Sequence, residues 1–268
     1  MSIASIAKVA KAALPKPLFS AARATYHWTR PAIIGPAHAT VFICDDTTDT
    51  FIGVNNHFSW LSAGNEINAK IVMRFYDEAG ALIATRTERL GYFQSKMLNV
   101  REFVRSHGSQ AKFGMFSLAV EPINRWNAAV KRMGVVTGIF YVLHQDTNGS
   151  IALLHPNARI GKVAPLENWR SLQVISTQGL RNITLYQLNA GDYRHQASHY
   201  LIDAATGKVF MEKTTEYEGK STHKIVFDID GKNAPAQLYL HADSLPSSNA
   251  KPLLQRTFEC GQFTISHA

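Results

Sequence analysis

The sequence predicts an all-β protein with two tandem antiparallel β-sandwich domains, of the jelly-roll or immunoglobulin type, preceded by a short amphipathic N-terminal helix. Hydrophobic residues recur with a period of two from about residue 48 onward, and this spacing is typical of half-buried strands. The second half of the chain repeats the first in units of roughly 100 residues, which suits a sandwich better than a solenoid. The 268 residues, 46% hydrophobic and 18% charged, fit about two globular domains.

The chain begins with the pattern of an amphipathic helix. Over residues 2–14 the apolar side chains fall on one helical arc with two lysines opposite, and the pattern ends before Pro15. The segment is too short to span a membrane. We expect residues 1–36 to form a basic arm that packs on its own body or on a neighbouring subunit. Weak attachment of residues 3–14 to a membrane surface is the alternative.

The first half is expected to continue as a meander of strands. Residues 67–76 alternate between apolar and polar side chains, which predicts a strand with one face in the core. Asp-Glu-Ala-Gly at 77–80 predicts a hairpin turn into a second strand at 81–88. A third strand is expected at 95–100.

A short helix and a further strand follow. Asn99 and Glu102 have the spacing of a capping box, which predicts a helix that ends at Gly108. The apolar pattern then predicts a strand at 113–120. A helix is expected at 122–132, because proline is favoured in a first helical turn.

The first half ends in a predicted hairpin. Two apolar runs, 135–143 and 151–154, flank the sequence Asp-Thr-Asn-Gly at 146–149. Because Asn-Gly accepts the positive φ angles of a type I′ turn, the pattern predicts two strands joined by such a turn.

The second half repeats the elements of the first. When Gly80 is aligned with Gly207, the flanking apolar positions correspond at one offset, and the first copy carries an insertion around Trp60. The repeat predicts one β-sandwich domain at 37–160 and another at 161–268.

Three short motifs in the second copy carry a family resemblance. They are Leu-Asn-Ala-Gly-Asp at 188–192, Thr-His-Lys-Ile-Val-Phe at 222–227 and Ser-Asn-Ala-Lys-Pro-Leu-Leu-Gln at 248–255. In these motifs the chain resembles the small β-sandwich family of the sensory rhodopsin transducer. The resemblance implies an antiparallel sandwich, homo-oligomerisation, and binding of a protein partner or a small, sugar-like ligand. The family module is single, whereas this chain doubles it and adds an arm, so the family's partner does not carry over.

Charge and cysteine content narrow the partners and the compartment. Five of the eight net positive charges lie in the first 44 residues, so the remainder is nearly neutral. The nearest cluster of basic residues with an aromatic residue is Arg125, Trp126, Lys131 and Arg132. We interpret the scattered basic residues as a solvated surface and expect no nucleic-acid partner. Cys44 and Cys260 are far apart and in no ligand-like spacing, which favours a reducing, cytoplasmic setting, with peripheral membrane attachment as an alternative. No metal or cofactor is expected.

The sequence favours a binding or assembly module over an enzyme. It contains no nucleophile elbow, phosphate-binding glycine loop, dinucleotide fingerprint, zinc-protease motif or paired-cysteine motif. The alternative is an enzyme that acts on a sugar or nucleotide-sugar, with His195, His199 or Glu121 in proton transfer. A structural subunit docked through its N-terminal arm is a third reading.

The first candidate site lies in the loops of the first copy. Trp60 stands in the inserted loop close to Asn55 and His57, and Trp126 follows Arg125 in a second loop. Exposed tryptophans with amide and arginine neighbours could stack on a sugar ring and hydrogen-bond its hydroxyls. The alternative is that each tryptophan fills the end of a sandwich or a subunit interface.

The second candidate site is polar. His195 and His199 are four residues apart and point to one face of a strand, close to Asp192. In the repeat alignment both histidines fall on core positions of the first copy, which would mark a functional or strained site. We favour the alternative register, in which Ser198, Tyr200 and Ile202 face the core and both histidines are exposed.

Overall fold

The computed structural model of the chain is mostly β, with 54% of residues in strands and 10% in helices. The described residues are 15–61, 66–132, 135–136, 140–156, 158–160, 163–248 and 250–268. The predicted β content is therefore observed. The predicted helix at 2–14 lies outside the described residues.

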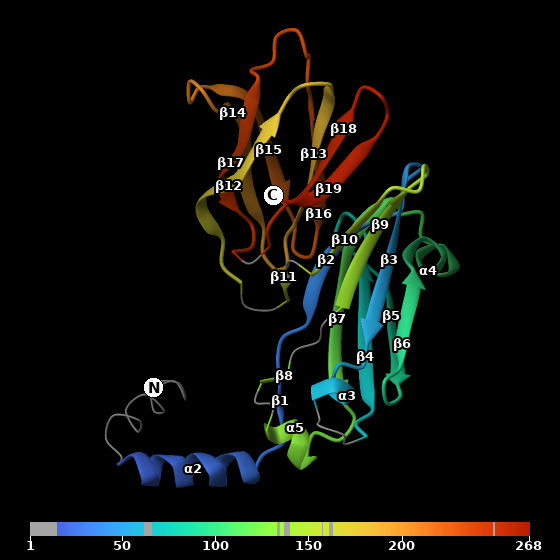
Figure 1. The fold of residues 1–268 in the computed structure, drawn as a ribbon, viewed down its shortest axis with the longest axis vertical. Coiled ribbons are helices and arrows are strands. Elements are labelled where there is room, and N and C mark those ends of the chain that lie inside the picture. Colours follow the sequence, from blue (N-terminus) through green and yellow to red (C-terminus); the bar gives the residue numbers. More distant parts are fainter. Residues whose placement is uncertain are drawn as a thin grey trace.

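The body consists of four small antiparallel sheets, arranged as a four-bladed β-propeller (Figure 1). Blade 1 has the strand order β10-β9-β3-β6, with β3 at Thr48–Asn55, β6 at Ser95–Asn99, β9 at Phe140–Asp146 and β10 at Ile151–Leu154. Blade 2 has the order β11-β2-β7-β4-β5, with β2 at His38–Ile43, β4 at Ala69–Tyr76, β5 at Leu82–Leu90, β7 at Phe113–Pro122 and β11 at Ala158–Arg159.

The second half of the chain forms the other two blades. Blade 3 has the order β16-β13-β18-β19, with β13 at Leu180–Leu188, β16 at Thr222–Asp228, β18 at Leu253–Phe258 and β19 at Phe263–His267. Blade 4 has the order β12-β17-β14-β15, with β12 at Leu166–Ser176, β14 at His195–Asp203, β15 at Val209–Tyr217 and β17 at Gln237–Leu245. In reverse order, the strands of blade 3 correspond to those of blade 1: β19, β18, β13 and β16 match β10, β9, β3 and β6. Blade 4 matches blade 2 without β11.

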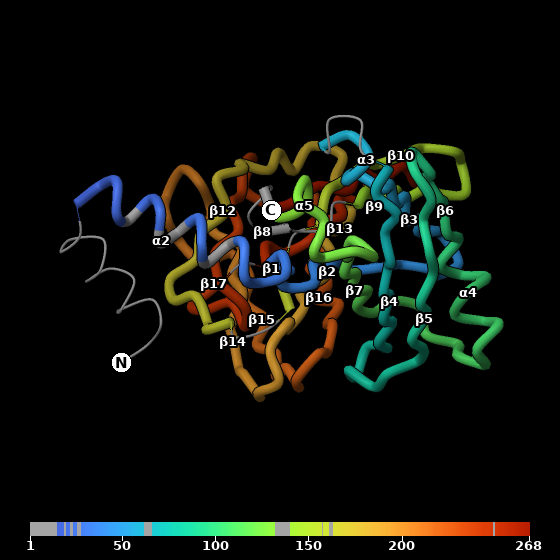
Figure 2. Tube along the Cα trace, turned by 90° about the horizontal axis from the view of Figure 1, so that it is seen from below, coloured from blue at the N-terminus to red at the C-terminus, as the bar shows by residue number. Residues whose placement is uncertain are grey.

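Small elements lie at both ends of the first half. β1 (Ile33–Ile34) pairs in parallel with β8 (Val135–Val136). The helices among the described residues are α2 (Lys16–Trp28), α3 (Phe58–Leu61), α4 (Val100–Ser106) and α5 (Ala128–Arg132). α4 lies at the end of blade 1 opposite α3 (Figure 1). Seen from below, α2 projects to one side of the blades (Figure 2). No helix among the described residues is long and apolar enough to cross a membrane.

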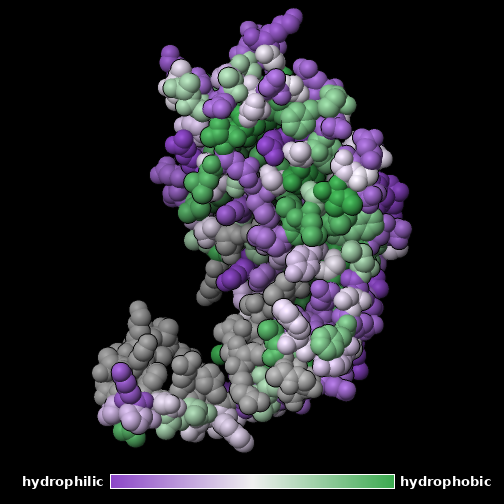
Figure 3. Space-filling model, in the orientation of Figure 1, coloured by the Kyte–Doolittle hydropathy of each residue, from purple (hydrophilic) through white to green (hydrophobic). Residues whose placement is uncertain are grey.

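Three hydrophobic cores lie between consecutive blades. Phe75 and Phe116 belong to the core between blades 1 and 2, and Leu201 and Phe227 to the core between blades 3 and 4. A third core joins the two halves of the chain, because Val41 and Ile43 of blade 2 pack in one cluster with Tyr186, Leu188 and Leu253 of blade 3. Figure 3 shows hydrophobic residues gathered where β9 and β10 approach this junction.

The predicted arrangement as two tandem β-sandwich domains is wrong. One strand in each of the two middle blades is buried on both faces: β2 is buried at five of its six positions, and β13 is buried continuously from Ile183 to Leu188. Strands covered on both faces read as unbroken apolar runs and not as alternation. The period-two pattern therefore does not extend to β2, whose residues pack against the second half of the chain.

Several local predictions are confirmed. The strand predicted at 67–76 is β4, and Asn99 caps α4 through its side-chain oxygen, which accepts a hydrogen bond from the Glu102 amide. The hairpin of β9 and β10 also forms, but its turn is not type I′. Gly149 has a φ of 85°, whereas Asn148 is not among the described residues with positive φ. A type I′ turn requires positive φ at both central residues.

One helix is additional to those predicted, and one prediction is corrected. The additional helix is α2, which begins at Lys16 with a proline in its first turn, where the missing N–H costs nothing. The helix predicted at 122–132 is shorter, because β7 continues to Pro122 and α5 begins only at Ala128.

Candidate functional site

Three of the predicted residues, Asn55, His57 and Trp60, line a single pocket at the end of blade 1. The pocket has a volume of about 370 Å³ and lies between the end of β3, α3, the loop between β5 and β6, and β9. We call it the Trp60 pocket. The remaining residues that line it are Asn56, Phe93, Gln94, Ser95 and Tyr141.

The short helix α3 is anchored on one side and open on the other. Phe58 is fully buried in the core between blades 1 and 2, and Ser59 is also buried. The amides of Trp60 and Leu61 donate to the His57 carbonyl at 3.2 and 3.1 Å. This anchoring turns Trp60 outward, where 81% of its surface is exposed. The large apolar surface of Trp60 is thus held in place by α3 but does not pack in the core.

Asn56 fixes the loops around the pocket. Its side chain is 3% exposed, and its Nδ2 donates to the carbonyls of Ile67 at 2.7 Å and Gly91 at 2.8 Å. Its backbone amide donates to the Gln94 carbonyl at 3.0 Å. One buried amide therefore ties together the β3–β4 and β5–β6 connections. Such a buried polar group must be hydrogen-bonded to be tolerated.

Phe93 completes the pocket in a strained backbone conformation. Its φ is 52°, in the left-handed region that non-glycine residues rarely occupy, and its side chain is 61% exposed. The Phe93 amide donates to Ser59 Oγ at 2.8 Å, which holds the loop against α3. Strain of this kind costs on the order of 1 kcal/mol or more and is most often found at functional sites. A glycine would avoid this cost, so we attribute the phenylalanine at this position to its aromatic ring.

The lining of the Trp60 pocket determines what it can bind. Trp60, Phe93 and Tyr141 supply apolar rings, while Asn55 and Gln94 supply amides that both donate and accept hydrogen bonds. None of the described residues that line it is Asp, Glu, Lys or Arg. The pocket therefore suits an uncharged ligand with an apolar face and several hydroxyl groups.

Arg125 and Trp126, the other predicted residues of the first copy, do not belong to this pocket. The Arg125 guanidinium donates to the Ala32 carbonyl through Nε at 3.0 Å and Nη2 at 2.7 Å, so it fastens the chain between α2 and blade 2. Trp126 is 58% exposed, and the Lys131 ammonium lies 5.0 Å from its ring centre. The structure therefore separates two tryptophans that the sequence had grouped in one site.

The favoured register of β14 is wrong. His199 is fully buried and faces the core between blades 3 and 4, as the repeat alignment indicated, whereas Ser198 and Tyr200 face outward. Ile202 is buried as well, because the register shifts by a bulge between Leu201 and Ile202. His199 Nε2 lies 2.7 Å from the Tyr217 hydroxyl, and its buried Nδ1 has no hydrogen-bond partner among the residues that the structure describes.

Burial keeps the His199–Tyr217 pair uncharged. It lowers the pKa of His199 to about 4, an effect that the Asp243 carboxylate only partly offsets, and it raises the pKa of Tyr217. Neither group therefore carries charge near neutral pH. The pair acts as a hydrogen bond inside the core.

His195 lies at the surface end of the same strand. Its Nε2 is 2.8 Å from Ser244 Oγ, and it lines a pocket of about 260 Å³ together with Tyr217 and Glu218. Asp192 does not join this group, because its carboxylate pairs with Lys220 at 3.0 Å. The structure thus separates the three polar residues predicted for the second site.

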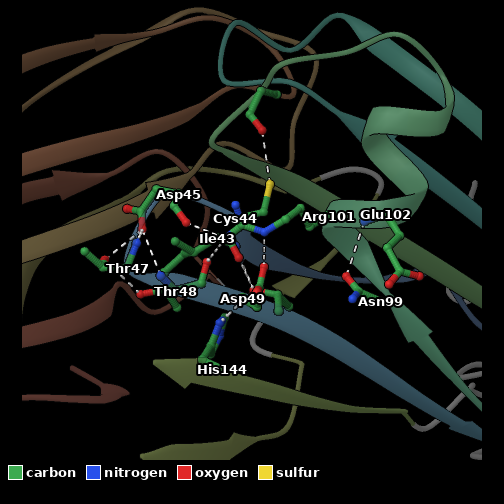
Figure 4. Close-up of polar contacts among 12 residues, drawn as sticks. Ile43, Cys44, Asp45, Thr47, Thr48, Asp49, Asn99, Arg101, Glu102 and His144 are labelled. Atoms are coloured by element: carbon green, nitrogen blue, oxygen red, sulfur yellow. Dashed lines mark hydrogen bonds and ion pairs between the residues drawn. The ribbon is translucent and has the colours of Figure 1, made fainter. Parts of the chain in front are cut away.

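A polar cluster that sequence reasoning missed lies at the opposite end of blade 1 (Figure 4). Asp45 accepts three hydrogen bonds within its own turn, at 2.8 to 3.0 Å, and Arg101 of α4 pairs with Asp49 and donates to the Asp45 carbonyl. Thr50 Oγ1 bonds the backbone of Ile43 and lies 2.9 Å from His144 Nδ1. The Asp45, Arg101 and Thr50 side chains already bond within the protein, whereas the buried His144 Nε2 has no hydrogen-bond partner among the described residues. We therefore assign the cluster a role in stabilising the fold.

Comparisons with known proteins leave the identity of the chain open. No protein-family model matches the sequence, and no curated protein is significantly similar to it. The resemblance to the sensory rhodopsin transducer family therefore stays a prediction. Function has to be argued from the geometry of the site.

Proposed function

We propose that this protein is a binding module that holds a small, uncharged, hydroxyl-rich ligand with the chemistry of a mono- or disaccharide in the Trp60 pocket. One observation carries the proposal. The exposed Trp60, which is not needed by the core, shares a hollow of about 370 Å³ with two further rings and several amides. This volume is within the roughly 300 to 1,000 Å³ typical of small-molecule sites.

The chemistry of a pyranose matches that of the lining. One face of the sugar ring presents C–H groups, which pack on an aromatic side chain, while its edge carries hydroxyls that pair with amides. Asn55 and Gln94 line the pocket and supply amides for such hydroxyls, although the Gln94 Oε1 already accepts a hydrogen bond from the Gly91 amide at 2.7 Å. A phosphate or a nucleotide would meet no lysine or arginine among the described residues that line the pocket.

The lining also favours binding over turnover. Hydrolysis of a glycosidic bond ordinarily needs two carboxyl groups on either side of the bond. The described residues that line the Trp60 pocket include no carboxylate. Glu121, considered from the sequence as an acid, lies in β7 of blade 2, where it pairs in register with Lys70.

The loops that form the pocket are held in place before any ligand arrives. Asn56 ties two connections together, and Ser59 holds the strained backbone of Phe93. Preorganisation of this kind reduces the entropy that binding would otherwise cost.

Thermal unfolding with a panel of neutral saccharides, followed by calorimetric titration of those that raise the Tm, tests the proposal. A ligand at 100 times its Kd should contribute about 2.7 kcal/mol to stability. The variant Trp60→Ala is expected to lose binding and keep the wild-type Tm, because Trp60 is 81% exposed. Trp126→Ala, an exposed tryptophan outside the pocket, is the matched control. Full binding by Trp60→Ala, or no stabilisation of the wild type by any saccharide, would reject the proposal.

A further inference from the structure

Two exposed tryptophans meet where α2 joins the blades. Trp28 ends α2 and is 82% exposed, and Trp126 precedes α5. The Lys131 ammonium lies 5.9 Å from the Trp28 ring centre and 5.0 Å from the Trp126 ring centre, and it donates to the Trp28 carbonyl at 2.6 Å. Ile123, also exposed, stands in the same loop as Trp126. We call Trp28, Ile123, Trp126 and Lys131 the tryptophan corner.

The fold holds the tryptophan corner rigidly while leaving it exposed. Arg125 fastens its loop to the Ala32 carbonyl, and the Trp126 amide donates to Asn124 Oδ1 at 3.0 Å. None of these bonds requires an indole ring at 28 or 126. Large exposed apolar groups that the core does not use mark an interaction surface.

The surroundings of the tryptophan corner are basic. The two segments that build this end, 15–34 and 123–131, contain no aspartate or glutamate. Their basic residues with described side chains are Lys16, Arg30, Arg125 and Lys131. Helix α2 leads away from the blades and continues this surface (Figure 2), with Leu18 exposed on it.

We propose that the tryptophan corner and α2 dock this protein on an anionic lipid bilayer surface. Tryptophan is enriched at membrane interfaces, where its apolar ring and its polar N–H both find partners. An amphipathic basic helix lies in the same interface, and each lysine or arginine adds attraction to anionic lipid. The surface differs from the arm at 3–14, which lies outside the described residues, and it does not depend on the ligand of the Trp60 pocket.

Charge and apolar exposure together favour a bilayer over other partners. A second copy docked through the same face would bring two acid-free basic surfaces together, which opposes association. A nucleic acid would satisfy the basic residues but would offer no apolar environment to Leu18 and Ile123. An anionic bilayer satisfies both requirements.

Co-sedimentation of the full chain with vesicles tests this proposal. We expect binding to vesicles of phosphatidylcholine mixed with phosphatidylserine, weaker binding to phosphatidylcholine alone, and loss of binding at high salt. The double variant Trp28→Ala/Trp126→Ala should bind anionic vesicles at least about tenfold more weakly, and Lys131→Gln should also bind more weakly. Both should keep the wild-type Tm, because the altered side chains are exposed or partly exposed. Trp60→Ala is the matched control and should bind vesicles nearly as well as the wild type.

Three results would overturn the proposal. They are no sedimentation of the wild type with anionic vesicles, equal sedimentation of the double variant, and binding that does not respond to anionic lipid. Self-association at this face, seen by sedimentation without vesicles and abolished in the double variant, would assign it to a second copy instead. Because saccharide binding is tested with Trp60→Ala and vesicle binding with the double variant, each proposal can fail without the other.

Discussion

Two buried histidines make the fold sensitive to mild acid. Burial lowers the pKa of His144 to about 3, with a smaller contribution from the nearby His267, and it lowers the pKa of His199 to about 4. In the unfolded chain both would titrate near the ordinary value of 6.5. Below that pH the unfolded state binds protons that the folded state does not bind. The free energy of unfolding must therefore fall as the pH falls from 6.5 toward 4.

The size of the effect follows from the two pKa values. One pKa unit corresponds to 1.36 kcal/mol, and about pH 5 lies roughly 1.5 units below the unfolded pKa, so each histidine costs about 2 kcal/mol there. Together they remove about 4 kcal/mol from a total stability typically on the order of 5 to 15 kcal/mol. Burial also lowers the pKa values of His38, His223 and His267, which act in the same direction.

Urea unfolding at neutral pH and at about pH 5 measures this loss directly. The variant His199→Phe removes one of the two groups, so it should reduce the dependence of the unfolding free energy on pH by about 2 kcal/mol over this range, whatever its effect at neutral pH. Ser198→Ala, at an outward-facing position of β14 that carries no titratable group, is the matched control and should leave the dependence unchanged. A free energy of unfolding that is constant or rises toward pH 5 would refute the reasoning.

Three further predictions concern individual side chains. Phe93→Gly should leave the unfolding free energy unchanged or raise it by about 1 kcal/mol, because glycine tolerates the φ of 52°. Calorimetry should show that this variant binds saccharides more weakly. A clear loss of stability would mean that Phe93 is structural. Tyr217→Phe should cost about 1 to 3 kcal/mol in urea unfolding, because it leaves His199 Nε2 unsatisfied, and no loss would deny that hydrogen bond. Phe58→Ala should cost about 3 to 5 kcal/mol and abolish saccharide binding by releasing α3; retained binding would show that α3 is not needed.

Local patterns in the sequence predict the local structure well. The alternation at 67–76 becomes β4, and the Asn99 cap starts α4 where the spacing placed it. Such signals depend on a few neighbouring residues. The helix predicted at 122–132 is an exception, because β7 continues to Pro122 and α5 begins only at Ala128. The register of β14 is another, because His199 faces the core.

The arrangement of the sheets could not be derived from the same patterns. Val41 and Phe42 face opposite cores, one between the halves and one within the first. A strand buried on both faces has no alternation to detect, and nothing in its own sequence states which sheet covers it. The prediction of two tandem sandwiches failed at this strand.

The site was predictable only where its residues share one loop. Asn55, His57 and Trp60 lie within six positions of one another and do converge. Phe93 and Tyr141 come from distant elements, and only the pairing of β3 with β6 and β9 brings them there. An exposed tryptophan is recognisable from sequence, but its neighbours depend on the fold.

The most direct test of the central claim is nuclear magnetic resonance of the tryptophan indole N–H groups during titration with a saccharide that raises the Tm. The chain has four tryptophans, so the indole signals distinguish the Trp60 pocket from the tryptophan corner, which holds Trp28 and Trp126, and from Trp169 in β12. Single variants assign the signals. If the Trp60 pocket is the ligand site, the Trp60 signal shifts with saturation while those of Trp28, Trp126 and Trp169 stay in place. A titration that shifts another indole and leaves Trp60 unmoved would contradict the account.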